Sequence, residues 1–235
     1  MRKIEIALPK GQRLLAPAYE IFKKAGFECA QLEAAIKAKS HKQLEYESDC
    51  GRANLLLVRI ADIPQYVDRN WADIGISAFD CFREYELSSK DAGHTMRGDN
   101  FISSILPDLK LCEKSRFCVA GLPENKEMYE KSKHSDEKVL SVATQHPFIA
   151  AWYFGKQDIL VDIVTISGSS ELMPRHGEVD VIFDIVETGS ALKENGLEIF
   201  ETAMDIQTKL LVSKAALKYD PEIAKVIEVM KNAIK

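Results

Sequence analysis

Short apolar runs alternate with amphipathic stretches along most of the chain. The first run, residues 4–8, has the length and composition of a strand. Residues 14–25 follow it with apolar side chains at helical spacing, and Gly26 marks their end. The alternation recurs down the chain and predicts further strands at 54–59, 71–77, 110–121, 139–143, 159–166, 180–186, 197–202 and 208–213.

The stretches between these strands predict helices at 61–69, 78–85, 148–155, 171–175, 191–195 and 216–235, with a charged loop and helix within 122–138. Alternating strands and helices over two sections predict an α/β protein with two domains around a cleft. Two segments, 31–51 and 87–108, show no clear period, and we place the crossing between domains in the second of them. The expected domains are 1–95, 96–192, and a return to the first domain with a terminal helix at 193–235.

The connection after the strand at 180–186 is the main candidate for chemistry. A Glu-Thr-Gly-Ser turn at 187–190 opens a short helix that Gly196 closes. Free N–H groups and the helix dipole at such a start favour an anion, typically a phosphate. Asp184 and Glu187 flank the turn, where they can hold a metal-bound sugar phosphate or stabilise positive charge on a ribose ring. The same pattern also fits an ordinary strand-to-helix connection with a hydroxyl cap.

Other strand ends carry polar residues of the same kind. Lys10 and Arg13 lie beside the start of the first helix, a good position to neutralise phosphates or simply a solvated turn. Arg59 follows a strand, where open α/β sheets bind ligands, although it also suits a capping or salt-bridging role. Ser167 and Glu171 belong to a second hydroxyl-and-glycine turn before a helix, where Glu171 also fits a capping carboxylate.

Composition narrows the class of protein. The 235 residues are 46% hydrophobic and 29% charged, with a net charge of −5, which argues against a general nucleic-acid binder. No signal peptide and no apolar run long enough for a membrane span are visible, so we expect a cytoplasmic protein. The five cysteines and five histidines lack the spacing of a disulfide framework, a zinc knuckle or a dedicated transition-metal site.

Several motifs together resemble one family. The stretch 171–197 resembles the signature segment of the ATP phosphoribosyltransferases, the enzymes that begin histidine biosynthesis. Near the N-terminus, Leu-Pro-Lys-Gly, a Val-Arg strand end, Asp-Ile-Pro and Ala-Asp-Ile-Gly-Ile also resemble that family. The residues that match are Lys10, Gly11, Arg59, Asp62, Gly75, Ser77, Asp80, Thr144, Pro147, Glu171, Gly177, Asp184, Thr188, Gly189 and Leu192.

The resemblance implies a fold like that of the type II periplasmic binding proteins, and the short form of the enzyme, which lacks a C-terminal regulatory domain. It implies transfer of phosphoribosyl from phosphoribosyl pyrophosphate to N1 of ATP. The implied catalytic residues are Lys10, Arg13, Arg59, Asp184 and Glu187. The implied substrate-binding residues are Gly11, Gly75, Ser77, Thr144, Ser167, Glu171, Thr188, Gly189, Ser190, Ala191 and Leu192.

The resemblance also implies a cofactor and partners. Mg²⁺ is expected to arrive with the substrate rather than at a dedicated metal site. Short forms act with a regulatory subunit that resembles histidyl-tRNA synthetase, so we expect a homodimer within a hetero-oligomer, with no nucleic acid and no membrane.

Departures from the family pattern keep two alternatives open. Gln12 is an apparent insertion, Ala78 and Ala191 replace a usual Gly and Thr, and Ala151 lies where an Arg is expected. Together they leave room for a catalytically impaired, nucleotide-binding paralogue with a regulatory role. A solute-binding protein of the same architecture is the second alternative.

Overall fold

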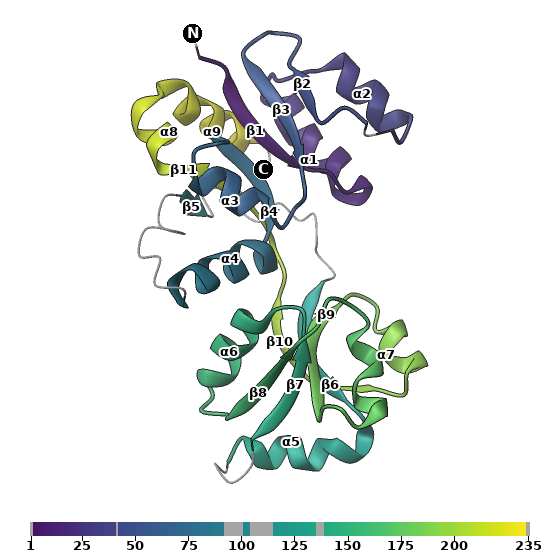
Figure 1. Ribbon diagram of the computed structural model, residues 1–235. Coiled ribbons are helices and arrows are strands. Elements are labelled where there is room, and N and C mark those ends of the chain that lie inside the picture. Colours follow the sequence, from purple (N-terminus) through teal and green to yellow (C-terminus); the bar gives the residue numbers. More distant parts are fainter. Residues whose placement is uncertain (1, 41, 92–100, 104–114, 135–138, 234–235) are drawn as a thin grey trace. The chain divides into compact units, whose positions relative to one another are not determined.

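The computed structural model describes residues 2–40, 42–91, 101–103, 115–134 and 139–233. The chain forms two compact units (Figure 1). Unit 1 comprises Met1–Cys112 and Gln207–Lys235, and unit 2 comprises Glu113–Ile206. Each unit contains one β-sheet with helices packed on it, so the predicted α/β class is confirmed. No helix in these described ranges has both the length and the apolar character to cross a membrane.

The sheet of unit 1 has the strand order β2-β3-β1-β4-β11-β5. The central strands β1, β3 and β4 are parallel, and β2, β11 and β5 are antiparallel to their neighbours. The strands are β1 (Ile4–Pro9), β2 (Glu45–Glu47), β3 (Ala53–Val58), β4 (Ile74–Ala78), β5 (Phe101–Ser103) and β11 (Thr208–Ser213). The helices are α1 (Gln12–Lys24), α2 (Ala30–Lys37), α3 (Ile63–Asp68), α4 (Phe79–Asp91), α8 (Lys214–Tyr219) and α9 (Pro221–Ala233).

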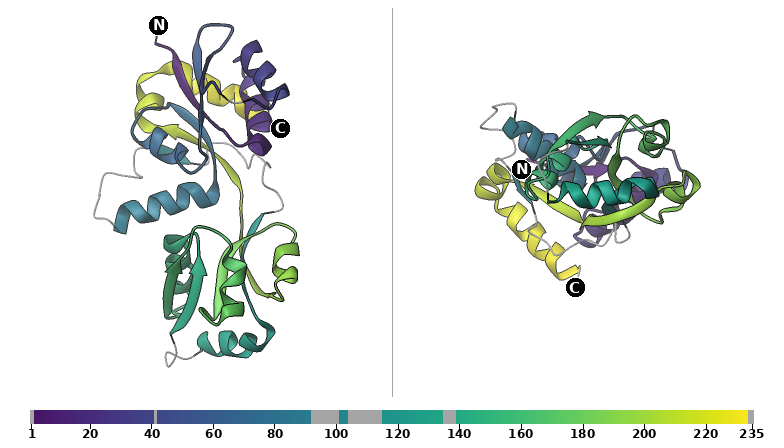
Figure 2. Two further views of the ribbon diagram at one scale, coloured as in Figure 1. Left: turned by 45° about the vertical axis from the view of Figure 1, so that its right-hand side comes forward. Right: turned by 90° about the horizontal axis from the view of Figure 1, so that it is seen from below.

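Two apolar clusters hold the helices of unit 1 on its sheet. The larger cluster joins strand residues such as Ile6 to Phe22 of α1 and Met230 of α9. The C-terminal helix α9, in yellow, accordingly packs beside α1, in purple (Figure 2). The second cluster joins Ala7 to Val67 of α3 and Phe82 of α4. Side chains that alternate along β1 thus enter different clusters, which is why that strand is apolar almost throughout.

Gly75 lets α3 approach the sheet closely. A Cβ at this position of β4 would lie 2.5 Å from Ile63 Cγ2 and 3.1 Å from Val67 Cγ2. Both methyl groups belong to buried, β-branched side chains, which have little rotational freedom. We therefore expect Gly75→Ala to lower the free energy of unfolding by about 1–3 kcal/mol, measured by urea denaturation.

Gly155 provides the matched control for this substitution. It is the last residue of α6 (Pro147–Gly155), and apart from its chain neighbours and the backbone of its own helix, no atom lies within 4 Å of where a Cβ would be. We expect Gly155→Ala to be neutral or slightly stabilising, because alanine favours helix and meets no neighbour. Equal losses of stability in the two variants would contradict the packing role of Gly75.

The sheet of unit 2 has the strand order β10-β6-β9-β7-β8, with β7, β8 and β9 parallel. Its strands are β6 (Arg116–Gly121), β7 (Leu140–Thr144), β8 (Val161–Thr165), β9 (Val181–Val186) and β10 (Glu198–Asp205). Besides α6, its helices are α5 (Lys126–Ser132) and α7 (Ser190–Glu194). The described residues of unit 2 also form the 3₁₀ turns η1 (Pro123–Asn125), η2 (Ser170–Leu172) and η3 (Pro174–His176). Phe183 of β9 stacks on Phe117 of β6 and contacts Phe154 of α6, so aromatic rings form much of this core.

The unit boundaries lie later in the chain than the sequence predicted, at 112/113 and 206/207 instead of 95/96 and 192/193. Strand β5 pairs with β11, which keeps residues beyond 95 in unit 1. Strand β10 pairs antiparallel with β6, which keeps it in unit 2 rather than returning it to unit 1. The predicted helix at 171–175 is instead the pair of 3₁₀ turns η2 and η3, because Pro174 lacks the N–H that a continuous helix needs.

Candidate functional site

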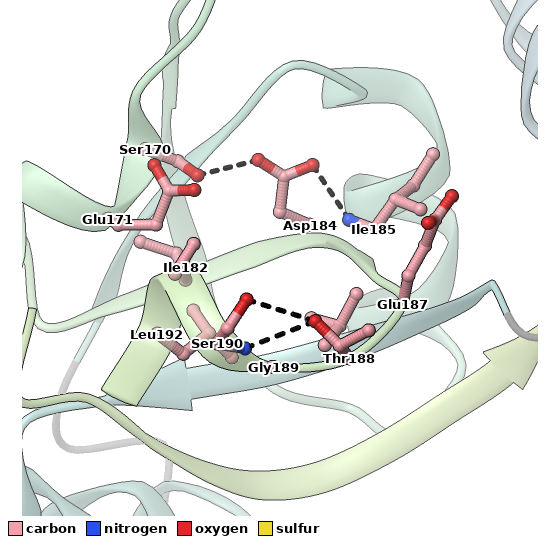
Figure 3. Close-up of a pocket in the computed structure, with 12 residues that line it drawn as sticks. Ser170, Glu171, Ile182, Asp184, Ile185, Glu187, Thr188, Gly189, Ser190 and Leu192 are labelled. Carbon is pink, nitrogen blue, oxygen red and sulfur yellow. Dashed lines mark hydrogen bonds between the residues drawn. The ribbon is translucent and has the colours of Figure 1, made fainter. Parts of the chain in front are cut away.

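The main candidate site is a pocket in unit 2, where β9 ends and α7 begins (Figure 3). Its volume is about 200 Å³. Gly189 caps α7 with a φ of 74°, a left-handed conformation that glycine adopts without strain. Eight residues predicted from the sequence line this pocket: Glu171, Asp184, Glu187, Thr188, Gly189, Ser190, Ala191 and Leu192. The predicted loop and its flanking carboxylates therefore do come together.

The Asp184 carboxylate is held by a hydrogen bond to each oxygen. Ser170 Oγ donates to Asp184 Oδ2 at 2.6 Å, and the backbone N–H of Ile185 donates to Oδ1 at 2.7 Å (Figure 3). Glu187 is exposed, and Ser115 Oγ donates to its Oε1 at 3.3 Å. The sequence reading missed Ser170 and Ser115. The Ser-Gly-Ser-Ser turn at 167–170 pointed to the neighbourhood of Ser170, whereas nothing along the chain linked Ser115 to Glu187.

The start of α7 offers hydrogen-bond donors to the pocket. Ser190 N donates to Thr188 Oγ1 at 3.4 Å, and the hydroxyls of these two residues lie 3.0 Å apart. Within the described part of the chain, the N–H groups of Ala191 and Leu192 have no acceptor, as is usual in the first turn of a helix. Hydroxyl and N–H donors around a left-handed glycine suit the oxygens of a phosphate.

Two other predicted residues of unit 2 lie outside the residues that line this pocket. Thr144 ends β7 and is fully buried, and its Oγ1 accepts a hydrogen bond from His146 N at 2.9 Å. That contact shapes the turn into α6. Ser167 is exposed just after β8. Both nevertheless lie at the carboxyl ends of the parallel strands, as the end of β9 does.

In unit 1, the predicted basic residues gather at the carboxyl edge of the parallel strands. Lys10 N donates to Val58 O at 2.7 Å, so Lys10 and Arg59 follow directly on paired strand ends, and both side chains are exposed. Gly11 caps α1, and its carbonyl accepts from Leu15 N at 2.9 Å. Arg13 is exposed in the first turn of α1. That helix begins at Gln12, so the apparent insertion is taken up at its start.

Two residues predicted to bind substrate have structural roles in unit 1. Gly75 is covered by α3, as described above. Ser77 is fully buried, and its Oγ donates to Ile60 O at 3.2 Å. That bond fixes the loop that follows Arg59, so Ser77 supports the basic edge through the backbone.

The carboxylates of the pocket suit a metal ion that arrives bound to the substrate. Among the residues that the structure describes, no group of three or more His, Cys, Asp and Glu side chains could hold a metal ion. Asp184 and Glu187 nevertheless bring two carboxylates to one pocket. Mg²⁺ is commonly held by one or two carboxylates together with substrate phosphates, so these residues fit such an ion.

Comparison with solved structures defines the class of protein first. A Candida albicans protein described as having the generic periplasmic binding protein structural fold aligns with a TM-score of 0.50 at 9% identity, covering 100% of this chain and 71% of that one. The ligand-binding component of an ABC-type import system from Staphylococcus aureus aligns with a TM-score of 0.52 at 10% identity, covering 99% and 74%. The chain is thus an α/β protein with a periplasmic-binding-protein-like fold, as predicted.

Sequence comparison then gives the family. The model described as HisG: ATP phosphoribosyltransferase matches residues 59–234. An ATP phosphoribosyltransferase from Bacillus mycoides (strain KBAB4) is 36% identical over 236 residues, covering 100% of this chain and 98% of that protein. Another from Clostridium novyi (strain NT) is 38% identical over 231 residues, covering 97% and 96%. The chain belongs to the ATP phosphoribosyltransferase family.

A solved relative agrees in both sequence and fold. A chain of the ATP phosphoribosyl transferase (HisG:HisZ) complex from Thermotoga maritima aligns with a TM-score of 0.72 at 25% identity. The alignment covers 98% of each chain. Both units of the present chain thus have counterparts in a single member of the family.

Proposed function

We propose that this chain transfers the phosphoribosyl group of phosphoribosyl pyrophosphate to N1 of ATP, giving phosphoribosyl-ATP and pyrophosphate, the first step of histidine biosynthesis. Membership of the family makes the chain a phosphoribosyltransferase. The observation that carries the proposal is the pocket of unit 2, where donors for a phosphate lie beside two carboxylates. A phosphorylated ribose presents the matching groups, a phosphate and a ring that gains positive charge.

The reaction is a substitution at C1 of the ribose. The lone pair of adenine N1 forms the new bond to C1, and the bond from C1 to the pyrophosphate oxygen breaks, with its electron pair leaving on pyrophosphate. Adenine N1 is already unprotonated near neutral pH, so no strong base is needed. The protein must bring two polyanions together and stabilise the charges that develop in the transition state.

Each part of the candidate site has a role in this proposal. Residues 188–192 bind the 5-phosphate of the ribose through hydroxyl and N–H groups. Asp184 and Glu187 face the ribose hydroxyls and stabilise positive charge at the ring. Lys10, Arg13 and Arg59 bind the pyrophosphate or the phosphates of ATP. Ala191 keeps its backbone donor, so the missing threonine hydroxyl removes only one contact from the loop.

Enzymes of this family need a divalent metal ion, and we propose that it is Mg²⁺ carried by the substrate. Asp184 and Glu187 are the residues that would hold it. When bound, Mg²⁺ supplies charge neutralisation for the departing pyrophosphate.

We further propose a regulatory partner. The Thermotoga maritima relative was solved as a HisG:HisZ complex. By analogy, this chain acts as the short form, as a homodimer within a hetero-oligomer whose regulatory subunit resembles histidyl-tRNA synthetase. Its substrates are cytoplasmic metabolites, so the cytoplasm is the proposed location.

The test is formation of phosphoribosyl-ATP from ATP, phosphoribosyl pyrophosphate and Mg²⁺, with pyrophosphatase present to remove the product pyrophosphate. The chain is assayed alone and with the histidyl-tRNA-synthetase-like subunit of the same source. Product is expected in the presence of the subunit, and dependence on the subunit supports the short form. Nucleotide binding without product in either tube would favour the impaired paralogue and overturn the proposed reaction.

A further inference from the structure

A buried serine contacts the carboxylate at the centre of the candidate site. Ser170 is 1% exposed, and its hydroxyl donates to Asp184 Oδ2 at 2.6 Å. This length is typical of a charge-assisted O–H···O⁻ hydrogen bond, which is stronger than a bond between neutral groups. Asp184 is half-buried and lines the pocket, so a hydrogen bond from the buried Ser170 hydroxyl restricts the orientation of its carboxylate.

The backbone around Ser170 is shaped to make this contact. Ser169 adopts a left-handed conformation, with a φ of 53°, immediately before the 3₁₀ turn that Ser170 begins. Non-glycine residues adopt this conformation uncommonly and at some energetic cost. Pro174 is buried at the start of the next 3₁₀ turn. The two turns and the left-handed residue hold Ser170 facing β9 rather than solvent.

The two hydrogen bonds to Asp184 divide its oxygens between two donors. Ser170 takes Oδ2 and the N–H of Ile185 takes Oδ1, and Figure 3 shows the carboxylate between them. Rotation about the side-chain bonds would break at least one of these contacts. The remaining lone pairs on the two oxygens therefore have a fixed direction before any ligand arrives.

We propose that Ser170 is a positioning residue that orients Asp184 toward the ribose of the bound substrate. The inference rests on the proposed function, in which the Asp184 carboxylate stabilises the positive charge that develops on the ribose ring. An interaction that strengthens in the transition state is sensitive to small displacements of the charged group. Loss of the Ser170 hydroxyl should therefore lower kcat more than it raises KM for phosphoribosyl pyrophosphate.

The experiment compares Ser170→Ala with Ser132→Ala in the full assembly. Ser132 is also buried in unit 2, and its hydroxyl donates to Tyr129 O at 2.7 Å, away from the residues that line the pocket. It controls for the general effect of removing a buried serine hydroxyl. We expect Ser170→Ala to lower kcat on the order of 10-fold to 100-fold, the range seen when a supporting contact to an active group is lost. Ser132→Ala should leave kcat unchanged.

A double-mutant cycle with Asp184→Asn shows whether Ser170 acts through Asp184. In the Asp184→Asn background, Ser170→Ala should change kcat by less than about two-fold, because there is no carboxylate left to orient. The inference would be overturned if Ser170→Ala lowered kcat by the same factor in both backgrounds, or did not lower kcat in the wild-type background. In either case, turnover by the wild-type assembly would still support the proposed function. An inactive wild-type assembly would overturn the proposed function and the inference together.

Discussion

Replacing Asp184 with asparagine is expected to lower kcat/KM for phosphoribosyl pyrophosphate by about 100-fold or more. The substitution keeps the size of the side chain but removes its charge. Loss of one preorganised electrostatic contact to a developing charge typically costs about 100-fold to 1,000-fold in rate. The hydrogen bonds add to the effect, because Ser170 and Ile185 both donate to this group and an amide has only one accepting oxygen. The loss in kcat/KM is measured by steady-state kinetics of phosphoribosyl-ATP formation.

Asp162→Asn is the matched control for this charge change. Asp162 is exposed on β8 of the same unit and does not line the pocket. We expect it to retain wild-type kinetics, and thermal melting of both variants checks that each remains folded. Glu187→Ala should also lose activity, since Glu187 lies in the same pocket. Full activity in both Asp184→Asn and Glu187→Ala would remove the carboxylates from the mechanism.

Part of the site was predictable because its residues are close in sequence. The end of β9, the turn and the start of α7 form one continuous stretch, so Asp184, Glu187 and Thr188 had to lie near one another. Contacts between distant segments were not predictable in this way. Ser115 reaches Glu187 only because β6 pairs with β9, and no local pattern encodes that pairing.

The distinction between packing and ligand contact also required the structure. A resemblance marks Gly75 and Ser77 as family residues, but it does not say what they touch. The structure shows Gly75 against Ile63 and Ser77 bonded to the backbone of residue 60. Apolar runs located most strands within one or two residues, yet the same runs do not name a strand's partner. Strand β10 was therefore assigned to the wrong unit, although its position in the sequence was predicted.

Glu201 is the centre of a polar network that joins β10 to two helices of unit 2. Tyr129 of α5 and Tyr153 of α6 both donate hydrogen bonds to its carboxylate, and Lys133 Nζ lies 2.6 Å from Oε2. Tyr129 is fully buried and Tyr153 is 9% exposed. Removal of the carboxylate would leave two buried hydroxyls without their acceptor, and the half-buried ammonium group of Lys133 would keep only the longer ion pair with Glu130, at 3.3 Å. Such losses are costly because the desolvation penalty of each group remains.

We expect Glu201→Ala to lower the free energy of unfolding by about 2–4 kcal/mol, measured by urea denaturation. Glu198→Ala is the control, because Glu198 is exposed on the same strand. A change within about 0.5 kcal/mol is expected there, as for most surface substitutions. Similar losses in the two variants would show that the network contributes little beyond the strand itself.

The same network predicts how stability depends on pH. Burial alone would raise the pKa of Glu201, but hydrogen bonds from Lys133, Tyr153 and Tyr129 outweigh it and hold the pKa below its ordinary value of 4.5. A carboxylate whose pKa is lower in the folded state stabilises the protein fully above its unfolded pKa, and this contribution is lost as the pH falls through the folded pKa.

The uncharged variant Glu201→Gln cannot titrate at this position, so it separates the charge of Glu201 from every other acidic group. The gap in unfolding free energy between wild type and Glu201→Gln should be largest near about pH 7 and should narrow as the pH falls below about 4.5. Urea denaturation of both proteins at several pH values measures the gap. A gap that stays constant across this range would mean that the charge of Glu201 adds nothing to stability, because a contribution from shape and uncharged hydrogen bonding is the same at every pH.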